Sequence, residues 1–301
     1  MCRSTEQSST TRLFLVLCRR GASSCLLFLC LALSCVSQAT AAHNKGCFHG
    51  QGGLSRQIRG LQLQITSAND EWGDPECRLK IRDSNNRPIV SEDDWSLSVL
   101  HDDLDVDGDG TLDLVIEGYS GGAHCCWTYY IVSTGANARL LLRFENEREA
   151  GFFLNKESGR IEIGTWDGAF DYFDGLCHGC TPFPTVYLRM HDGKLIDISS
   201  EYVSVYDVII ADSNRALAPE DRQTLRSLAK NPSEAEGSSG RAAKALAIVF
   251  AYLYSGRKEQ ARKSLEELWP RFDVERVWGL IEQTRRNGIL RYTRGEMRSL
   301  S

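Results

Sequence analysis

An acidic run is the part of the sequence best suited to chemistry: Asp105-Val106-Asp107-Gly108-Asp109-Gly110-Thr111-Leu112-Asp113. Its carboxylates stand at positions 1, 3, 5 and 9, and a glycine occupies position 6. Calcium takes about six to eight oxygen ligands, and alternate carboxylates can surround one ion where a glycine allows a sharp turn. The pattern therefore predicts a calcium site. Its expected ligands are the side chains of Asp105, Asp107, Asp109 and Asp113 and the backbone carbonyl of Thr111.

The charge around this run strengthens the prediction. No Lys or Arg occurs between Arg87 and Arg139, so the carboxylates lack a nearby counter-charge in the sequence. Without a cation, their mutual repulsion must be relieved by protonation or by disorder. A solvated acidic turn is the alternative. An EF-hand is not indicated, because position 12 is Ile116 where an EF-hand has a bidentate Glu.

Cysteines and histidines form a second candidate cluster. Of the 11 cysteines, five precede residue 43, and the remaining six are Cys47, Cys77, Cys125, Cys126, Cys177 and Cys180. An even number predicts disulfides if the protein is exported, as its first 42 residues indicate, and the pairing is left open. Zinc bound by thiolates with His124 or His178 is a second interpretation. A redox pair in Cys177-His178-Gly179-Cys180 is a third, although the prolines that follow disfavour the helix that activates such a pair.

Acidic residues elsewhere keep an enzyme under consideration. Glu162, Asp167, Asp171 and Asp174 lie among aromatic residues, and a pair of carboxylates could hydrolyse a glycosidic bond. No spacing identifies such a pair, and no nucleophile elbow, zinc-protease motif or phosphate loop occurs. A non-catalytic module that binds a protein or a glycan is therefore favoured over a hydrolase.

The first 42 residues have the order of an export signal. Arg12, Arg19 and Arg20 precede an apolar stretch, Cys25–Val36, which is too short to span a bilayer. Small residues at positions 39–42 then offer a cleavage site. The sequence predicts a secreted or periplasmic protein with no transmembrane span in the mature chain. Lipid anchoring at Cys35 is a variant of the same interpretation.

Charge excludes one class of partner. The signal segment carries four Arg and one Glu, a net charge of +3, and the whole chain has a net charge of −5. The mature part is therefore near −8, and it contains no basic run. Nucleic acid is not an expected partner.

The pattern of apolar residues divides the mature chain into two parts. Residues 43–212 are predicted to be a β-rich domain that carries the calcium loop, because short alternating or apolar runs are separated by turn residues. An antiparallel β-sandwich or a propeller-like arrangement fits this pattern. The predicted strands include Leu61–Thr66, Arg78–Ile81, Trp95–Leu100, Leu112–Glu117, Trp127–Ser133, Arg139–Phe144, Arg160–Thr165, Thr185–Met190 and Leu195–Ile198.

Residues 213–301 are predicted to be helical. Ala218-Pro219-Glu220-Asp221 resembles a helix start, 231–240 is a polar loop, and 242–269 is amphipathic with a break at Ser255-Gly256. A further helix is expected over 272–287. The spacing of Tyr252, Gly256 and Ala261 resembles one unit of a tetratricopeptide repeat. A single helical hairpin is the simpler interpretation, because about three such units are needed for stability.

Two resemblances to known families start from the acidic loop and the apolar strand that follows it. The second also includes Tyr129-Tyr130-Ile131-Val132 and then Val186-Tyr187-Leu188-Arg189 with Asp192-Gly193-Lys194-Leu195. The Asp-x-Asp-x-Asp-Gly-x-x-Asp pattern resembles the calcium loops of FG-GAP and VCBS repeats. The layout from Asp103 to Ile198 also resembles the bacterial periplasmic group of I-type lysozyme-inhibitor-like proteins. Both resemblances imply a β-rich binding domain with calcium in the loop. The inhibitors of that group use a Ser-Gly-x-Tyr loop, whereas Ala123 follows Ser120-Gly121-Gly122 here.

Overall fold

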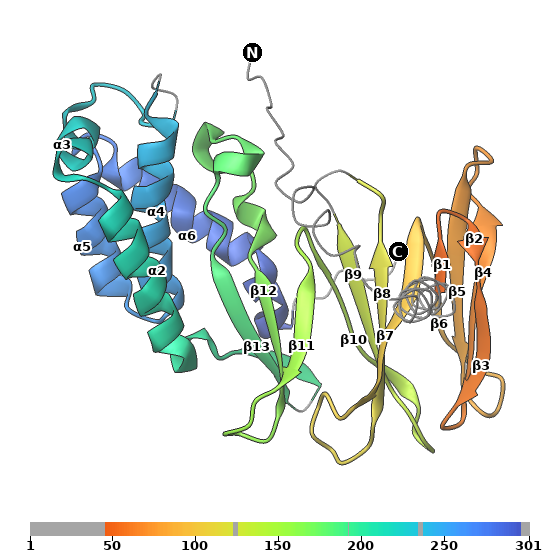
Figure 1. Cartoon of the computed structure of the whole chain (residues 1–301). Coiled ribbons are helices and arrows are strands. Elements are labelled where there is room, and N and C mark those ends of the chain that lie inside the picture. Colours follow the sequence, from red (N-terminus) through yellow and green to blue (C-terminus); the bar gives the residue numbers. More distant parts are fainter. Residues whose placement is uncertain (1–45, 123–125, 192, 234–236, 296–301) are drawn as a thin grey trace, which may run out of the picture. The chain divides into compact units, whose positions relative to one another are not determined.

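Three antiparallel sheets and a group of C-terminal helices make up the described part of the chain (Figure 1). The computed structural model describes residues 46–122, 126–191, 193–233 and 237–295. The predicted signal peptide, Cys35, His124 and Cys125 lie outside these residues. Residues 46–295 belong to a single compact unit.

The first sheet has the strand order β10-β9-β8-β7-β1-β2. Its strands are β1 (Gly46–Phe48), β2 (Gln51–Gly52), β7 (Ser96–Leu104), β8 (Asp113–Tyr119), β9 (Trp127–Ser133) and β10 (Arg139–Asn146). The second sheet contains β3 (Leu54–Ile58), β4 (Leu61–Asn69), β5 (Pro75–Arg82) and β6 (Pro88–Asp94). The third contains β11 (Ala150–Leu154), β12 (Ile161–Trp166), β13 (Thr185–His191) and β14 (Lys194–Asp197).

The first sheet is buried on both faces, which explains the unbroken apolar runs in β8 and β9. Successive side chains of a strand point to opposite faces. Leu114 and Ile116 accordingly join the core shared with the second sheet. Val115, between them, joins the core that includes the third sheet and the helices. This packing of sheet on sheet gives the predicted mainly β fold a sandwich-like form.

The helices share a core with the strands. They are α2 (Val203–Ala216), α3 (Pro219–Ser227), α4 (Ser239–Tyr254), α5 (Lys258–Leu268) and α6 (Val274–Asn287), followed by the 3-10 helix η6 (Ile289–Arg294). One continuous hydrophobic cluster contains Ile131 of β9, Leu188 of β13 and Leu246 of α4. Pro219 stands at the first turn of α3 with Glu220 and Asp221, as the sequence predicted. The break predicted at Ser255-Gly256 separates α4 from α5.

One predicted boundary differs from the structure. The sequence pattern continued the β region to residue 212, whereas that position lies inside α2, which begins at Val203. The segment Val203–Ile210 is rich in β-branched residues, which favour strands by propensity. Burial of Tyr206 and Ile210, four residues apart, shows that helical packing prevails there.

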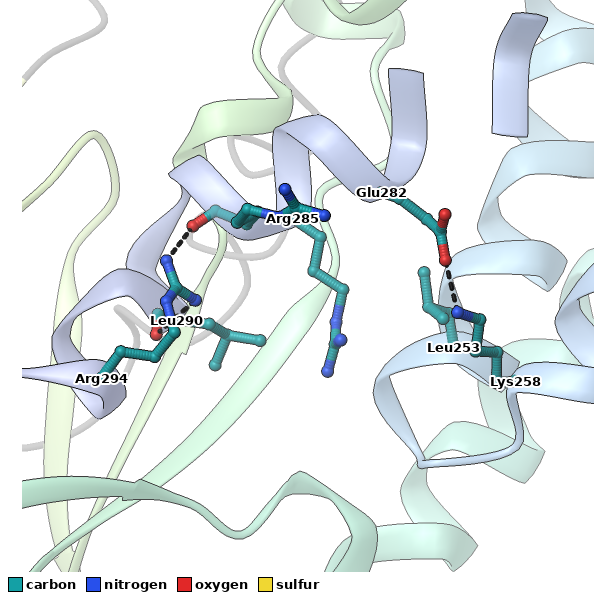
Figure 2. A pocket seen from close by; sticks show the side chains of 7 residues that line it. Leu253, Lys258, Glu282, Arg285, Leu290 and Arg294 are labelled. Carbon is teal, nitrogen blue, oxygen red and sulfur yellow. Dashed lines mark hydrogen bonds and ion pairs between the residues drawn. The ribbon is translucent and has the colours of Figure 1, made fainter. Parts of the chain in front are cut away.

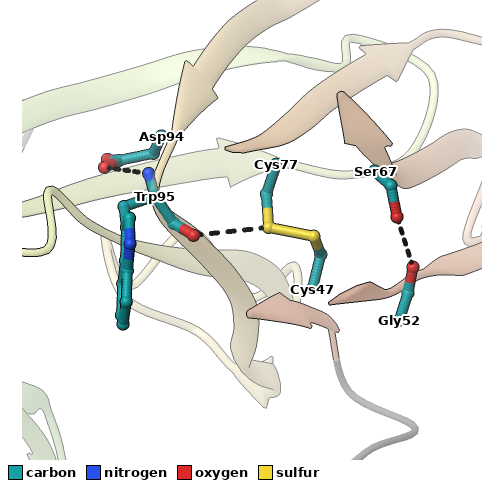
Figure 3. The surroundings of a disulfide bond; sticks show 6 residues. All are labelled: Cys47, Gly52, Ser67, Cys77, Asp94 and Trp95. Carbon is teal, nitrogen blue, oxygen red and sulfur yellow. Dashed lines mark hydrogen bonds between the residues drawn. A yellow bond between two sulfur atoms is a disulfide. The ribbon is translucent and has the colours of Figure 1, made fainter. Parts of the chain in front are cut away.

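A buried disulfide joins β1 of the first sheet to β5 of the second. Cys47 and Cys77 form this bond, and Figure 3 shows it beside the backbone of Trp95. The Cys77 sulfur lies 3.5 Å from the Trp95 carbonyl oxygen. A covalent link between two sheets holds the sandwich edge together, in agreement with the predicted disulfides. Nowhere in the described ranges is there a helix with the length and apolar character needed to cross a membrane.

Candidate metal centre

The acidic run forms the loop of the β7–β8 hairpin. Leu104 at the end of β7 pairs with Asp113 at the start of β8, so both ends of the loop are held by the sheet. Gly108 and Gly110 have φ angles of 76° and 88°. These left-handed conformations favour glycine, and they let the chain turn sharply where the sequence predicted a turn.

Backbone hydrogen bonds hold the carboxylates of the loop in place. Asp105 accepts from the N–H groups of Gly108 at 2.7 Å and of Gly110 at 2.9 Å. Asp107 accepts from the Asp109 N–H at 3.1 Å, and Asp109 accepts from the Thr111 N–H at 2.7 Å. The loop therefore curls inward around its own side chains. One carboxylate oxygen from each of Asp105, Asp107 and Asp109 lies within 4.8 Å of the others.

Asp113 is fully buried, and its carboxylate is not part of the cluster formed by Asp105, Asp107 and Asp109. Its Oδ2 accepts a hydrogen bond of 2.8 Å from the Val106 N–H. Its Oδ1 is also buried and accepts no hydrogen bond of normal geometry from a described residue, although the backbone N–H of Asp107 lowers the pKa of this carboxylate. A buried carboxylate oxygen without a partner is costly, and it calls for a proton, a water or a cation.

The electrostatics of the loop favour a cation. Burial, together with the charges of Asp107 and Asp105, raises the pKa of Asp113 to about 7. Burial and the neighbouring carboxylates of Asp109 and Asp105 also raise the pKa of Asp107. Raised values mean that burial and mutual repulsion disfavour the ionised carboxylates, even though Arg139 lowers the pKa of Asp107. A divalent ion would supply compensating positive charge.

Arg160 ties the loop to the third sheet. Its guanidinium donates to the backbone carbonyl of Asp107 at 2.7 Å and to that of Met190 at 3.3 Å. The group lies directly over Gly108, where an added Cβ would stand 2.3 Å from it. Gly108 is therefore required both for its backbone conformation and for the close approach of this arginine.

A cavity of about 420 Å³ adjoins the loop. Asp107 and Asp109 line it together with Arg139, Arg160 and His191. Sequence reasoning did not identify the last three as site residues. Arg160 lies 53 positions from Asp107 in the chain, and no local pattern marks such a contact.

The donor set fits calcium. Asp105, Asp107 and Asp109 offer oxygens from one cluster, and Asp113 has a buried oxygen to satisfy. The backbone carbonyl of Thr111 is the further predicted ligand. Hydrogen bonds to some of these carboxylates do not exclude coordination, because an ionised carboxylate has about four acceptor sites. An all-oxygen set of this kind suits a hard cation rather than zinc.

The acids considered for catalysis each have a structural partner. Glu162 is buried and bonds to Arg189 and Tyr202. The carboxylate of Asp167 is also buried, and it accepts from the Tyr254 hydroxyl at 2.6 Å. Asp171 lies 2.8 Å from His178, and Asp174 lies 2.6 Å from Arg276. These contacts connect strands, 3-10 helices and α-helices. The four acids therefore form stabilising hydrogen bonds and ion pairs within the fold.

Four of the six predicted cysteines form two disulfides. Cys47 pairs with Cys77, and Cys177 pairs with Cys180. Cys126 is disulfide-bonded too, and its partner lies outside the described residues. Oxidised cysteines offer no thiolate to zinc.

Comparisons of the chain with protein-family models, with curated proteins and with solved structures found no match.

Proposed function

We propose that this chain is an exported, calcium-binding, β-rich interaction module that is not catalytic. The observation that carries the proposal is a buried Asp113 oxygen that accepts no hydrogen bond of normal geometry from any described residue, next to three carboxylates that converge within 4.8 Å. Calcium bound by Asp105, Asp107, Asp109, Asp113 and the Thr111 carbonyl would satisfy that oxygen and offset the repulsion. The ion would also hold the β7–β8 hairpin in one conformation.

The cavity beside the loop supports a binding role. A protein or glycan ligand that enters it would meet Asp107 and Asp109 of the loop together with Arg139 and Arg160. Export to a secreted or periplasmic location is supported by the disulfides, because such bonds persist in oxidising compartments.

Thermal unfolding with and without calcium tests this function. A ligand that binds only the folded state at 100 times its Kd adds about 2.7 kcal/mol of stability. For a domain of this size that corresponds to a rise in Tm of roughly 5–10 °C. We expect this rise in the wild-type protein, and we expect Asp107→Ala and Asp109→Ala to abolish it.

Asp103→Ala is the matched control. Asp103 lies just before the loop with a 74 % exposed side chain, and it is not in the carboxylate cluster. This variant should keep the full response to calcium. Equal melting curves in calcium and in chelator for the wild-type protein would overturn the proposal.

A further inference from the structure

A second cavity lies among the C-terminal helices, and its walls carry an excess of positive charge. Its volume is about 270 Å³, and its cationic lining residues are Lys258 of α5, Arg285 and Arg286 of α6, and Arg294 of η6. In Figure 2, Leu290 and Arg294 stand on one side, Leu253 and Lys258 stand on the other, and Arg285 reaches between them. Four cationic side chains thus border one small space.

Among the described residues, the lining has four cationic side chains and one acidic residue. That acidic residue, Glu282, is paired with Lys258 at 2.5 Å. Arg286 makes no ion pair with any described residue. The whole chain, in contrast, has a net charge of −5. A cationic cavity in an acidic protein concentrates positive potential at one place, and a cavity with low-dielectric walls focuses it.

Arg285 is held in place while part of its guanidinium remains unsatisfied. It lies over the Tyr254 ring at 5.2 Å and stands 3.6 Å from an Asp197 oxygen. Its Nε is buried and has no hydrogen-bond partner among the described residues. The stacking fixes the plane of the guanidinium, which reduces the entropy lost when an anion binds to it.

The apolar part of the lining limits the kind of anion. Leu253 and Leu290 border the cavity beside the charged groups. The volume lies just below the roughly 300–1,000 Å³ typical of ligand pockets, so a small molecule fits and a polymer chain does not. Lys258 is also the first residue of α5, where the positive end of a helix dipole adds to the field.

We propose that this cavity between α4, α5, α6 and η6 binds a small organic anion, a phosphate ester or a carboxylate with a short apolar part. The guanidinium groups of Arg285 and Arg286 bind the anionic group, because a planar guanidinium matches a phosphate or carboxylate through two parallel hydrogen bonds. Leu253 and Leu290 contact the apolar part. This site is separate from the calcium loop and does not depend on it.

Calorimetric titration of the full mature protein tests the proposal, at constant ionic strength and with calcium-binding buffers excluded. The probes are phenyl phosphate, benzoate and inorganic phosphate. We expect one of the two aromatic anions to bind saturably at one site, more tightly than inorganic phosphate does. Preference for phenyl phosphate would identify a phosphate ester, and preference for benzoate a carboxylate.

Variants of the lining give the expected changes. Arg286→Gln removes one charged donor and should raise the Kd for the anion about tenfold or more. Glu282→Gln removes the negative charge of the lining and frees Lys258, so it should tighten binding. Arg215→Gln is the matched control, because Arg215 is a 77 % exposed arginine on α2 outside the cavity.

Two outcomes would overturn the site. One is the lack of saturable binding of both aromatic anions to the wild-type protein. The other is equal weakening by Arg286→Gln and Arg215→Gln, which would show only a general charge effect. Circular dichroism of each variant confirms that it is folded. Arg286→Lys keeps the charge but not the planar guanidinium, so its affinity should lie between those of the wild type and Arg286→Gln.

Discussion

Three acidic side chains are fully buried in the described part of the molecule, and their hydrogen-bond partners distinguish them. Asp113, Asp167 and Glu162 are all fully buried, but their surroundings differ. Glu162 has an arginine partner, and Asp167 accepts hydrogen bonds from a tyrosine and from backbone N–H groups. Asp113 alone of the three retains a buried oxygen that accepts no hydrogen bond of normal geometry from a described residue. That difference separates a structural acid from a candidate metal ligand.

Asp94 gives a prediction at this scale that is independent of calcium. Burial raises its pKa to about 6, and the carboxylate packs against Gly118. The folded protein therefore holds a proton that the unfolded chain has lost between about pH 4 and pH 6, so the free energy of unfolding falls as pH rises through that window. Asp94→Asn has no charge to bury. In this variant the free energy of unfolding should therefore lack the decrease with pH that ionisation of Asp94 causes.

The measurement is denaturant unfolding of both proteins from pH 4 to pH 7. The stability of Asp94→Asn relative to wild type should rise with pH and level off above about pH 6, as the sign of the shift requires. Asp103→Asn, at an exposed position, serves as the control. A difference between Asp94→Asn and wild type that is constant with pH would contradict the buried ionisation.

At the scale of elements, loops and disulfides connect the sheets. The β7–β8 loop is held at its base by strand pairing and at its tip by Arg160. The Cys47–Cys77 bond connects β1 and β5, whereas Cys177–Cys180 closes a short turn around the 3-10 helix η4 (His178–Cys180). The two bonds have sequence separations of 30 and 3.

These separations predict unequal contributions to stability. Cross-linking restricts the unfolded chain more when the closed loop is longer, which gives about 4 kcal/mol for the first bond and about 2 kcal/mol for the second. The double variant Cys47→Ser/Cys77→Ser should therefore lose more stability than Cys177→Ser/Cys180→Ser. Guanidinium unfolding of both variants measures the difference, and a larger loss for the second variant would contradict the prediction.

At the scale of the whole molecule, the shared core determines how much of the fold could be predicted. The strands with clear apolar patterns were found, because burial of β8 and β9 on both faces leaves continuous apolar runs. The short or polar strands β1, β2, β3, β6 and β11 lie in the region predicted to be β-rich but were not placed individually, since they lack such a pattern. The start of α2 was missed, because its helical form depends on tertiary packing of Tyr206 and Ile210.

The candidate site was predictable to a similar extent. The acidic loop follows from the spacing of its carboxylates, which are close together in the chain. The contacts of Arg139, Arg160 and His191 with the loop region depend on how distant strands meet. The cationic cavity is lined by residues of four helical elements, and no spacing of residues in the sequence indicates it.

The shared core also gives a prediction about truncation. A chain that ends at Asp212 loses α4 and η6, and with them the Tyr254 hydroxyl and the Ile289 N–H that bond to the buried Asp167 carboxylate at 2.6 and 3.2 Å. It also exposes the apolar cluster that Leu246 and Val249 cover. We expect this fragment to lack a cooperative thermal transition. A cooperative transition close to that of the chain from residue 43 to residue 301 would show that the helices are dispensable for the fold.

Isothermal titration calorimetry of chelator-treated protein that lacks residues 1–42 measures calcium binding by the β7–β8 loop without any intermediate step. We predict saturable binding of one calcium ion per chain, weaker binding of magnesium because that ion demands a smaller and more regular site, and loss of calcium binding in Asp107→Ala. No saturable binding at millimolar calcium, or the same binding isotherm for Asp107→Ala as for wild type, would show that the loop is not a calcium site.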